Sequence, residues 1–144
     1  MKLALPKGHR LLSPKRVAPD GAPSNQRITL ADLAKDAWVQ TSEASACARH
    51  VVRICRAAGF EPRVSFESDD YLTVQGLVAA GVGVALIPEL ALSQTVSYDI
   101  AVTELHPVAP VRHVVAATRG AGVSLPAAAS MLDILQDEAR RYRP

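Results

Sequence analysis

The sequence predicts an α/β fold, in which strands and helices alternate along the chain. Residues 82–87 form a continuous apolar run, VGVALI, which is typical of a strand buried on both faces of a parallel sheet. Before this run, apolar residues recur at helical spacing in two segments, residues 44–58 and 71–78. Gly59 and Gly81 follow the two segments, where the left-handed conformation that ends a helix favours glycine.

The N-terminal part of the chain is expected to hold a short strand, a long loop and a short helix. Residues 2–5 predict the strand, because they are mostly apolar and are followed by turn-forming residues. Residues 13–27 contain several prolines among charged and small polar residues, which predicts a turn-rich surface loop. Thr29 can cap the following helix, with Asp32 at the capping-box position. The sequence therefore predicts a short helix over residues 30–35.

Two strand–helix pairs are expected next. Residues 38–40 predict a strand, and the helix after it carries an apolar stripe. Residues 62–66 predict the second strand, and we expect Ser68 or Asp69 to cap the helix that follows. Strand, helix and strand over residues 62–87 indicate a βαβ unit with a right-handed crossover. The apolar stripe of the first helix consists of Ala44, Cys47, Val51, Ile54 and Ala58.

The C-terminal part of the chain is expected to hold two strands and a closing helix. Residues 100–105 predict the first strand and residues 111–118 the second. The closing helix is expected to begin at Pro126, because proline is favoured in the first turn of a helix. Its apolar face consists of Ala128, Met131, Leu132, Leu135 and Ala139.

The chain has two cysteines, Cys47 and Cys55, and both fall in the first long helix. At about 1.5 Å rise per residue they lie roughly 12 Å apart along the helix. A disulfide needs Cα atoms within about 7 Å, so the pair cannot bridge inside an intact helix. We interpret them as small apolar residues near a core, with a redox sensor as the alternative.

Composition excludes several classes of protein. The chain has 144 residues, of which 49% are hydrophobic, enough for a real core. The formal net charge is +2, and the scattered basic residues give no sign of a nucleic-acid surface. The longest apolar run is far too short to span a bilayer, and charged residues interrupt the apolar N-terminus. We therefore expect a cytoplasmic protein that makes no contact with a membrane.

Catalytic and metal-binding patterns are not evident. The histidines have no metal-ligand spacing among themselves or with the cysteines. The sequence has no GxSxG elbow, no phosphate-binding loop and no GxGxxG motif, and a Ser/His/Asp set could be assembled only by chance. We expect no enzymatic activity, no catalytic residue, no metal and no cofactor. The histidines are His9, His50, His106 and His113.

Two polar segments are better candidates for a binding site, because each lies where a predicted strand ends and a helix begins. Ligands of open α/β sheets gather beyond the carboxyl ends of strands, and helix N-termini offer unpaired N–H groups. Plain helix capping is the alternative interpretation. Helix N-termini suit a carboxylate or phosphate ligand, but the acidic residues of the second segment argue against a strongly anionic ligand at that helix and leave a neutral or amine-bearing ligand open. The candidate residues are Thr41, Ser42 and Glu43 in one segment, and Glu67, Ser68 and Asp69 in the other.

Several motifs occur in an order that is typical of one known family. LALPKGHRL at residues 3–11 is similar to a strand followed by LPxGHPL, and LADLA at residues 30–34 with the later WV is similar to LxDLAxxxWV. CRAAGFEP at residues 55–62 and the segment 64–70 follow in the same order. VQGLVAAGVGVALIP at residues 74–88 resembles the most specific motif, VxxLVAAGxGVALxP. Over nearly its whole length, the chain resembles the effector-binding domain of LysR-type transcriptional regulators.

The resemblance implies a periplasmic-binding-protein-like (type 2) fold with two Rossmann-like α/β lobes. A small effector would bind between the lobes and bias their closure. The six candidate residues match positions of the family's ligand cleft. The same motif implies that Gly81 adopts a positive φ at a helix end and that Gly83 allows close backbone packing.

The resemblance also implies how the chain divides. Residues 20–104 would form a complete second lobe, and residues 1–12 and 105–144 would be parts of the first. The first half of lobe one and the family's DNA-binding helix-turn-helix have no counterpart here, so the chain is expected to be an N-terminally truncated effector-binding domain. Family members form homodimers or homotetramers, and contact with promoter DNA would need the helix-turn-helix that this chain lacks.

Other functions stay open at the level of the sequence. The first alternative is a solute-binding protein of a transport system, which has the same fold. An enzyme on the two-lobed fold would need a nucleophile or acid–base pair that the motifs do not provide. An interaction module that pairs with a longer regulator is a further alternative.

Overall fold

The structure, a computed structural model, describes residues 1–12, 27–92, 99–107, 109–118 and 126–141. The chain divides into two compact units, Met1–Arg112 and His113–Pro144. Nearly all of the loop predicted at residues 13–27 lies outside the described residues.

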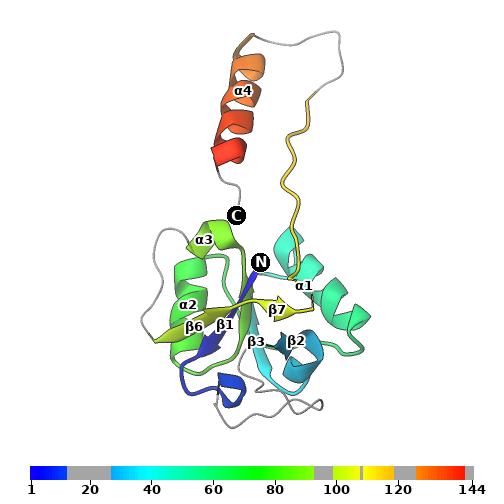
Figure 1. The fold of residues 1–144 in the computed structure, drawn as a ribbon, viewed down its shortest axis with the longest axis vertical. Coiled ribbons are helices and arrows are strands. Elements are labelled where there is room, and N and C mark those ends of the chain that lie inside the picture. Colours follow the sequence, from blue (N-terminus) through cyan, green and yellow to red (C-terminus); the bar gives the residue numbers. More distant parts are fainter. Residues whose placement is uncertain (13–26, 93–98, 108, 119–125, 142–144) are drawn as a thin grey trace. The chain divides into compact units, whose positions relative to one another are not determined.

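The centre of the first unit is a strand from the N-terminus of the chain (Figure 1). This strand, β1 (Lys2–Pro6), pairs antiparallel with β5 (Ala85–Ile87) on one side and with β6 (Ile100–Thr103) on the other. The strand predicted at residues 2–5 is therefore confirmed. The predicted division placed residues 1–12 in lobe one. In the structure, β1 instead shares a sheet with β5 and β6, two strands expected in lobe two.

Two parallel strands continue the sheet beyond β5. Strand β3 (Ala37–Gln40) pairs parallel with β4 (Arg63–Glu67), and Trp38 forms a parallel bridge with Val84. The strand predicted over residues 82–87 is shorter in the structure, where β5 covers only Ala85–Ile87. It has a parallel neighbour on one side and an antiparallel neighbour on the other, so the prediction of a parallel sheet was wrong at this strand. The apolar run reflects burial on both faces, which a mixed sheet provides equally well.

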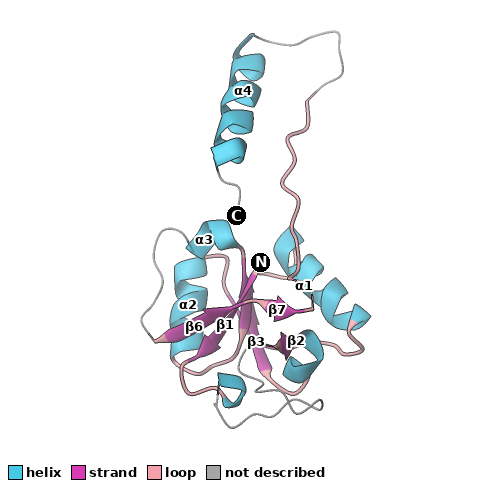
Figure 2. Ribbon diagram, in the orientation of Figure 1, coloured by secondary structure: helices cyan, strands magenta, loops and turns pink. Residues whose placement is uncertain are grey.

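Two long helices cover opposite faces of the sheet (Figure 2). Helix α1 (Ala46–Ala57) packs on the face that carries Leu3 and Leu5, and helix α2 (Tyr71–Ala79) packs on the face that carries Ala4. Successive side chains of a strand point to opposite faces, so β1 contributes to both cores. The predicted strand–helix–strand units are confirmed: α1 connects β3 to its neighbour β4, and α2 connects β4 to β5 across β3.

The ends of these helices follow the predicted capping patterns in part. Gly59 has a φ of 89° and Gly81 a φ of 78°, as expected for residues that end helices. Helix α2 begins at a different cap from the one predicted, because the side chain of Asp70 accepts the N–H groups of Leu72 and Thr73. Ser68 and Asp69 lie too early in the chain to reach the unpaired N–H groups of the first helical turn.

The first predicted helix is shorter and tighter than expected. Thr29 and Asp32 form the predicted capping box, but the turn that they start is the 3-10 helix η2 (Leu30–Leu33). Another 3-10 helix, η1 (Arg10–Leu12), follows β1. Asp36 connects the two segments, since it accepts from Arg10 at 2.8 Å and lies 3.3 Å from His9.

Gly83, which was predicted to allow close packing, does so where β3 lies beside the residues that precede β5. A Cβ atom at Gly83 would lie 2.6 Å from the carbonyl oxygen of Ala37. The same carbonyl accepts the N–H of Val84 at 2.8 Å. Any side chain at Gly83 would therefore push the two strands apart.

The predicted strand over residues 100–105 is divided in the structure. It forms β6 and then β7 (Leu105–His106), which pairs parallel with β2 (Ile28–Thr29). A short helix, α3 (Glu89–Leu92), follows β5. Among the described residues, no helix is long and apolar enough to cross a membrane.

The strand predicted at residues 111–118 is absent, and that prediction was wrong. No described strand forms a β-ladder with this segment, and Val111, Val114 and Val115 are exposed. A β-propensity pattern makes a strand only when a neighbouring strand takes up its hydrogen bonds. The closing helix, in contrast, is confirmed as α4 (Pro126–Arg141).

Candidate functional site

The two polar segments predicted from the sequence lie side by side in the structure. Because β3 and β4 are parallel, their carboxyl ends meet at one edge of the sheet, where Gln40 is paired with Glu67. Beyond this pair, the backbone N–H of Ser68 donates to the carbonyl of Gln40 at 3.0 Å. The N–H of Ser42 donates to the carboxylate of Asp69, also at 3.0 Å. We call this region the strand-end site; it contains Thr41, Ser42, Glu43, Glu67, Ser68 and Asp69.

Helices α1 and α2 both begin at the strand-end site, but other residues cap them. The hydroxyl of Ser45 accepts the N–H of Ala48 at 2.9 Å and lies 2.5 Å from the hydroxyl of Thr41. Asp70 caps α2, and three hydrogen bonds, the first from the Thr73 hydroxyl, hold the pKa of its carboxyl below the usual value. None of the six predicted residues is therefore the cap of either helix, which leaves Ser42 and Ser68 half-buried at the edge.

Acidic side chains dominate the exposed rim of the strand-end site. Glu43, Glu67, Asp69 and Asp70 are all exposed. The helix N-termini bring positive dipole ends to the same edge, but Asp70 already uses part of the donor capacity of α2. The balance disfavours a strongly anionic ligand.

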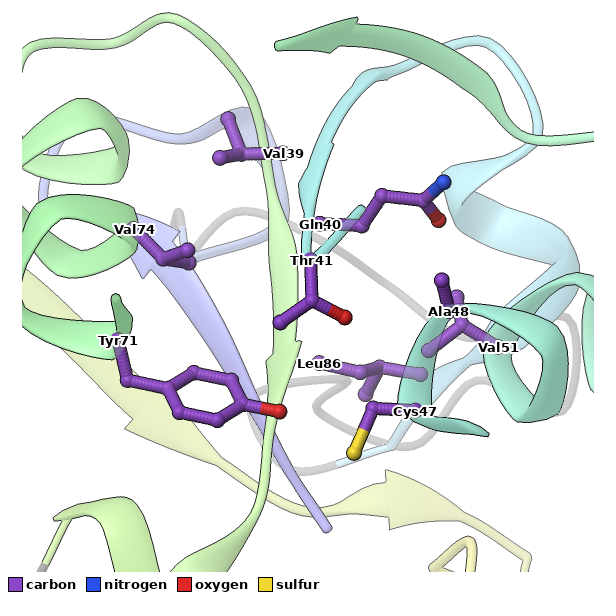
Figure 3. A pocket seen from close by; sticks show the side chains of 9 residues that line it. All are labelled: Val39, Gln40, Thr41, Cys47, Ala48, Val51, Tyr71, Val74 and Leu86. Atoms are coloured by element: carbon purple, nitrogen blue, oxygen red, sulfur yellow. The ribbon is translucent and has the colours of Figure 1, made fainter. Parts of the chain in front are cut away.

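A narrow pocket lies directly behind this rim, between β3, α1 and α2 (Figure 3). Its free volume is about 10 Å³, which is room for a single water molecule. The pocket is therefore a narrow recess and not a cavity that could enclose a small molecule. Its lining comprises Val39, Gln40, Thr41, Cys47, Ala48, Val51, Tyr71, Val74 and Leu86.

The pocket presents polar groups that sequence reasoning did not assign to a site. Gln40 is only 7% exposed, and its side-chain oxygen has no hydrogen-bond partner among the described residues, although its amide nitrogen lies 3.4 Å from Glu67. The hydroxyl of Tyr71 points across the pocket toward Thr41 and Cys47 (Figure 3). Burial, and then Cys47, raise the pKa of this hydroxyl.

The two cysteines have different surroundings. Cys47 is half-buried at the pocket, and its sulfur accepts from the guanidinium of Arg112 at 2.9 Å. Cys55 lies in the core beneath α1, where burial raises the pKa of its thiol to about 12. Both are free thiols, as the helical spacing predicted. In the described part of the chain, no three His, Cys, Asp or Glu side chains gather as metal ligands would.

Comparison with known proteins identifies the fold that carries this site. The model of the LysR substrate binding domain matches residues 2–140. The chain belongs to the LysR substrate-binding domain family. The family model covers both compact units, including helix α4.

Curated relatives of this LysR domain are transcriptional regulators. The transcriptional dual regulator GltC of Bacillus subtilis is 38% identical over 68 residues, which are 47% of this chain and 23% of GltC. The regulator ShiR of Corynebacterium glutamicum is 34% identical over 126 residues, which are 83% of this chain and 38% of ShiR. The chain thus spans well under half the length of these relatives.

Solved structures of the family have the same α/β fold. The C-terminal domain of a probable LysR family regulator from Rhodococcus sp. RHA1 is 26% identical, with a TM-score of 0.58 over 76% of this chain and 49% of that one. The effector binding domain of QuiR, solved with shikimate, is 14% identical, with a TM-score of 0.65 over 99% of this chain and 62% of that one. The predicted periplasmic-binding-protein-like fold of type 2 is confirmed.

The LysR resemblance in the sequence located the strand ends, but not the residues behind them. Cys47 and Tyr71 were predicted only as members of apolar helix faces, and Gln40 only as the end of a strand. Arg112 stands 65 residues from Cys47, so no local pattern could connect the two. Only the packing of α1 and α2 on the same strand brings these side chains to one pocket.

Proposed function

We propose that this chain is the effector-sensing module of a LysR-type transcriptional regulator. A small metabolite would bind at the strand-end site, and Ser42, Ser68 and Thr41 would contact it. The observation that carries the proposal is the pairing of the two polar segments at the carboxyl ends of β3 and β4, which is where open α/β sheets bind ligands.

Two features of the site support a binding role rather than catalysis. Gln40 provides a buried oxygen that needs a donor, and a bound ligand or water can supply one. Relatives of the same fold were solved with small molecules, namely the BenM effector binding domain with benzoate and that of QuiR with shikimate. The acidic rim supports a neutral or amine-bearing effector for this chain.

In this proposal the pocket of the first unit is one wall of a cleft between two lobes. The lobe with the strand-end site comprises residues 20–104 together with β1 and β7, which pair with its strands, and the rest of residues 105–144 would contribute to the other. An effector that contacts both walls stabilises the closed arrangement and shifts the population toward it. In a homodimer or homotetramer, that shift would change how a helix-turn-helix domain, outside these 144 residues, meets promoter DNA.

The proposal is tested by replacing one hydroxyl at the strand-end site. A panel of aromatic acids, amino acids and metabolite amides, with benzoate and shikimate included, is screened for compounds that raise the melting temperature of the chain. We expect Ser68→Ala to abolish the dose–response of a promoter reporter to such a compound in the full-length regulator, without lowering the melting temperature of the free protein.

Ser65→Ala is the matched control, because Ser65 lies exposed on β4 away from the strand end. The control should respond like the unmodified protein. An unchanged dose–response in Ser68→Ala would refute the assignment of the strand-end site.

A further inference from the structure

A second hollow lies on the first unit, away from the strand-end site. It is bounded by α1, by Leu30 of η2 and by β7 with the segment that follows it, and its volume is about 360 Å³. Sites for small ligands have volumes of roughly 300–1,000 Å³. The hollow shares no lining residue with the pocket behind the strand-end site. Its apolar wall comprises Leu30, Ile54, Leu105, Pro110 and Val111.

Two polar residues of α1 line the same hollow and contact each other. The Arg53 guanidinium lies 2.9 Å from Nδ1 of His50. A guanidinium can only donate, so Nδ1 accepts and the hydrogen of the neutral ring is on Nε2. This Nε2–H group is buried and has no hydrogen-bond partner among the described residues. Because Nε2 is buried, the ring contributes to the hollow through Nδ1, which holds the Arg53 guanidinium in place.

The charge around the hollow is positive. Of the described residues that line it, Arg53 is a permanent cation and none is a carboxylate. Burial and the positive charge of Arg53 lower the pKa of His50, and Arg112 adds to the effect. The neutral ring accepts from the Arg53 guanidinium through Nδ1 and keeps this permanent cation beside the hollow.

We propose that this hollow binds a small apolar carboxylate, such as a cyclic or branched carboxylic acid. The carboxylate accepts a hydrogen bond from the Arg53 guanidinium, which His50 holds beside the hollow. The hydrocarbon part lies against Ile54 and Leu105. An arginine–carboxylate contact fixes orientation as well as charge, and the apolar wall selects against small hydrophilic anions such as acetate. The hollow is separate from the strand-end site. It binds an anionic ligand, whereas the strand-end site is proposed to bind a neutral or amine-bearing one.

The experiment uses the 144-residue chain and two probes of the same shape. Cyclohexanecarboxylate carries the charge, and cyclohexanecarboxamide is its neutral equivalent. Amide chemical shifts of the 15N-labelled chain are followed during titration with each probe. We expect the carboxylate to shift the amides of His50, Ile54 and Leu105, and to bind about tenfold more tightly than the carboxamide, as one charge-assisted contact implies.

Two variants separate a specific contact from general attraction by the basic helix. Arg53→Gln should weaken binding of cyclohexanecarboxylate about tenfold and remove the preference over the carboxamide. Arg49→Gln is the matched control, since it removes the same charge from the same helix outside the hollow, and it should change the affinity less than about twofold. Far-ultraviolet circular dichroism checks that both variants are folded.

Three outcomes would overturn the proposal. The first is equal affinity of the two probes for the unmodified chain, which needs no variant. The second is an equal loss in Arg53→Gln and Arg49→Gln. The third is a set of shifts confined to Ser42, Ser68 and Tyr71, which would place the carboxylate at the strand-end site and would leave the proposed function intact.

Discussion

The two compact units carry similar patterns of apolar residues but bury them very differently. In the first unit, alternate residues of β1 enter two cores, one beneath α1 and one beneath α2. In the second unit, no described residue is buried, and Met131, Ile134 and Leu135 of α4 are 55%, 56% and 49% exposed. Helical periodicity thus predicts which face of a helix is apolar, but not whether a partner covers that face.

This difference in burial indicates which helices depend on packing for their stability. Helix α2 has Val74 and Val78 buried against the sheet, so its formation is coupled to the core. Isolated helices shorter than about 12–15 residues are marginal in water, and most helical stability in proteins comes from packing of an apolar face. The first unit is therefore expected to unfold as one cooperative body, whereas α4 buries no apolar face within its own unit.

The largest expected effect comes from truncating an apolar side chain in each unit. Leu5→Ala removes a fully buried side chain of the central strand and should lower the free energy of unfolding by about 2–5 kcal/mol. Ile134→Ala in α4 should change it by less than about 0.5 kcal/mol. Urea unfolding followed by the fluorescence of Trp38, the only tryptophan, measures both. Equal losses would mean that a partner covers α4 in solution.

A pair of glycines tests the close approach of strands inside the first unit. Gly83→Ala should destabilise the unit by about 1–3 kcal/mol, because the new Cβ would meet the carbonyl oxygen of Ala37 at 2.6 Å. Gly76→Ala is the matched control: Gly76 lies inside α2 with open space around it, so alanine should stabilise the helix by about 0.5–1 kcal/mol. Thermal unfolding measures the melting temperature of both variants. Shifts of the same sign in the two melting temperatures would contradict this interpretation.

The smallest expected effect concerns the acid stability of the helix that starts at the strand-end site. Hydrogen bonds from Thr73 and Leu72 hold the pKa of Asp70 below 3.8. The folded state then binds fewer protons than the unfolded state in acid, so this contribution to stability exists above the unfolded pKa and is lost as the pH falls through the folded pKa. Asp70→Asn should therefore show a smaller fall in its urea midpoint between about pH 5 and about pH 2.

Thr73→Val removes the hydroxyl that donates to Asp70 at 2.7 Å and should reproduce part of this change. If Asp70→Asn retained the full acid dependence, other carboxylates would be responsible for it.

Much of the fold could be predicted from local patterns. The periodicity of residues 44–58 and 71–78 predicted α1 and α2, and the positions of Gly59 and Gly81 predicted their ends. These predictions succeed because helix periodicity and positive φ depend on neighbouring residues alone. Residues 111–118 failed for the opposite reason, since a strand depends on a partner that the local sequence does not reveal.

The strand-end site was predictable to the same extent. Its two segments follow strands whose parallel direction can be inferred from the helices between them, so Ser42 and Ser68 could be expected at one edge. The pairing of Cys47 with Arg112, and the isolation of the Gln40 oxygen, could not be expected. Both depend on how segments far apart in the chain pack together, and that packing is set by many side chains at once.

By itself, the sequence determined the family, most of the strands and helices, the turns at the glycines and the two polar segments of the strand-end site. Only the tertiary structure decided that β1 lies between antiparallel neighbours, that Asp70 rather than Ser68 or Asp69 caps α2, and that the apolar face of α4 is not buried within its own unit. The physical reason is the range of the interactions. Caps and turns act over a few residues, whereas strand pairing and burial depend on residues far apart in the chain.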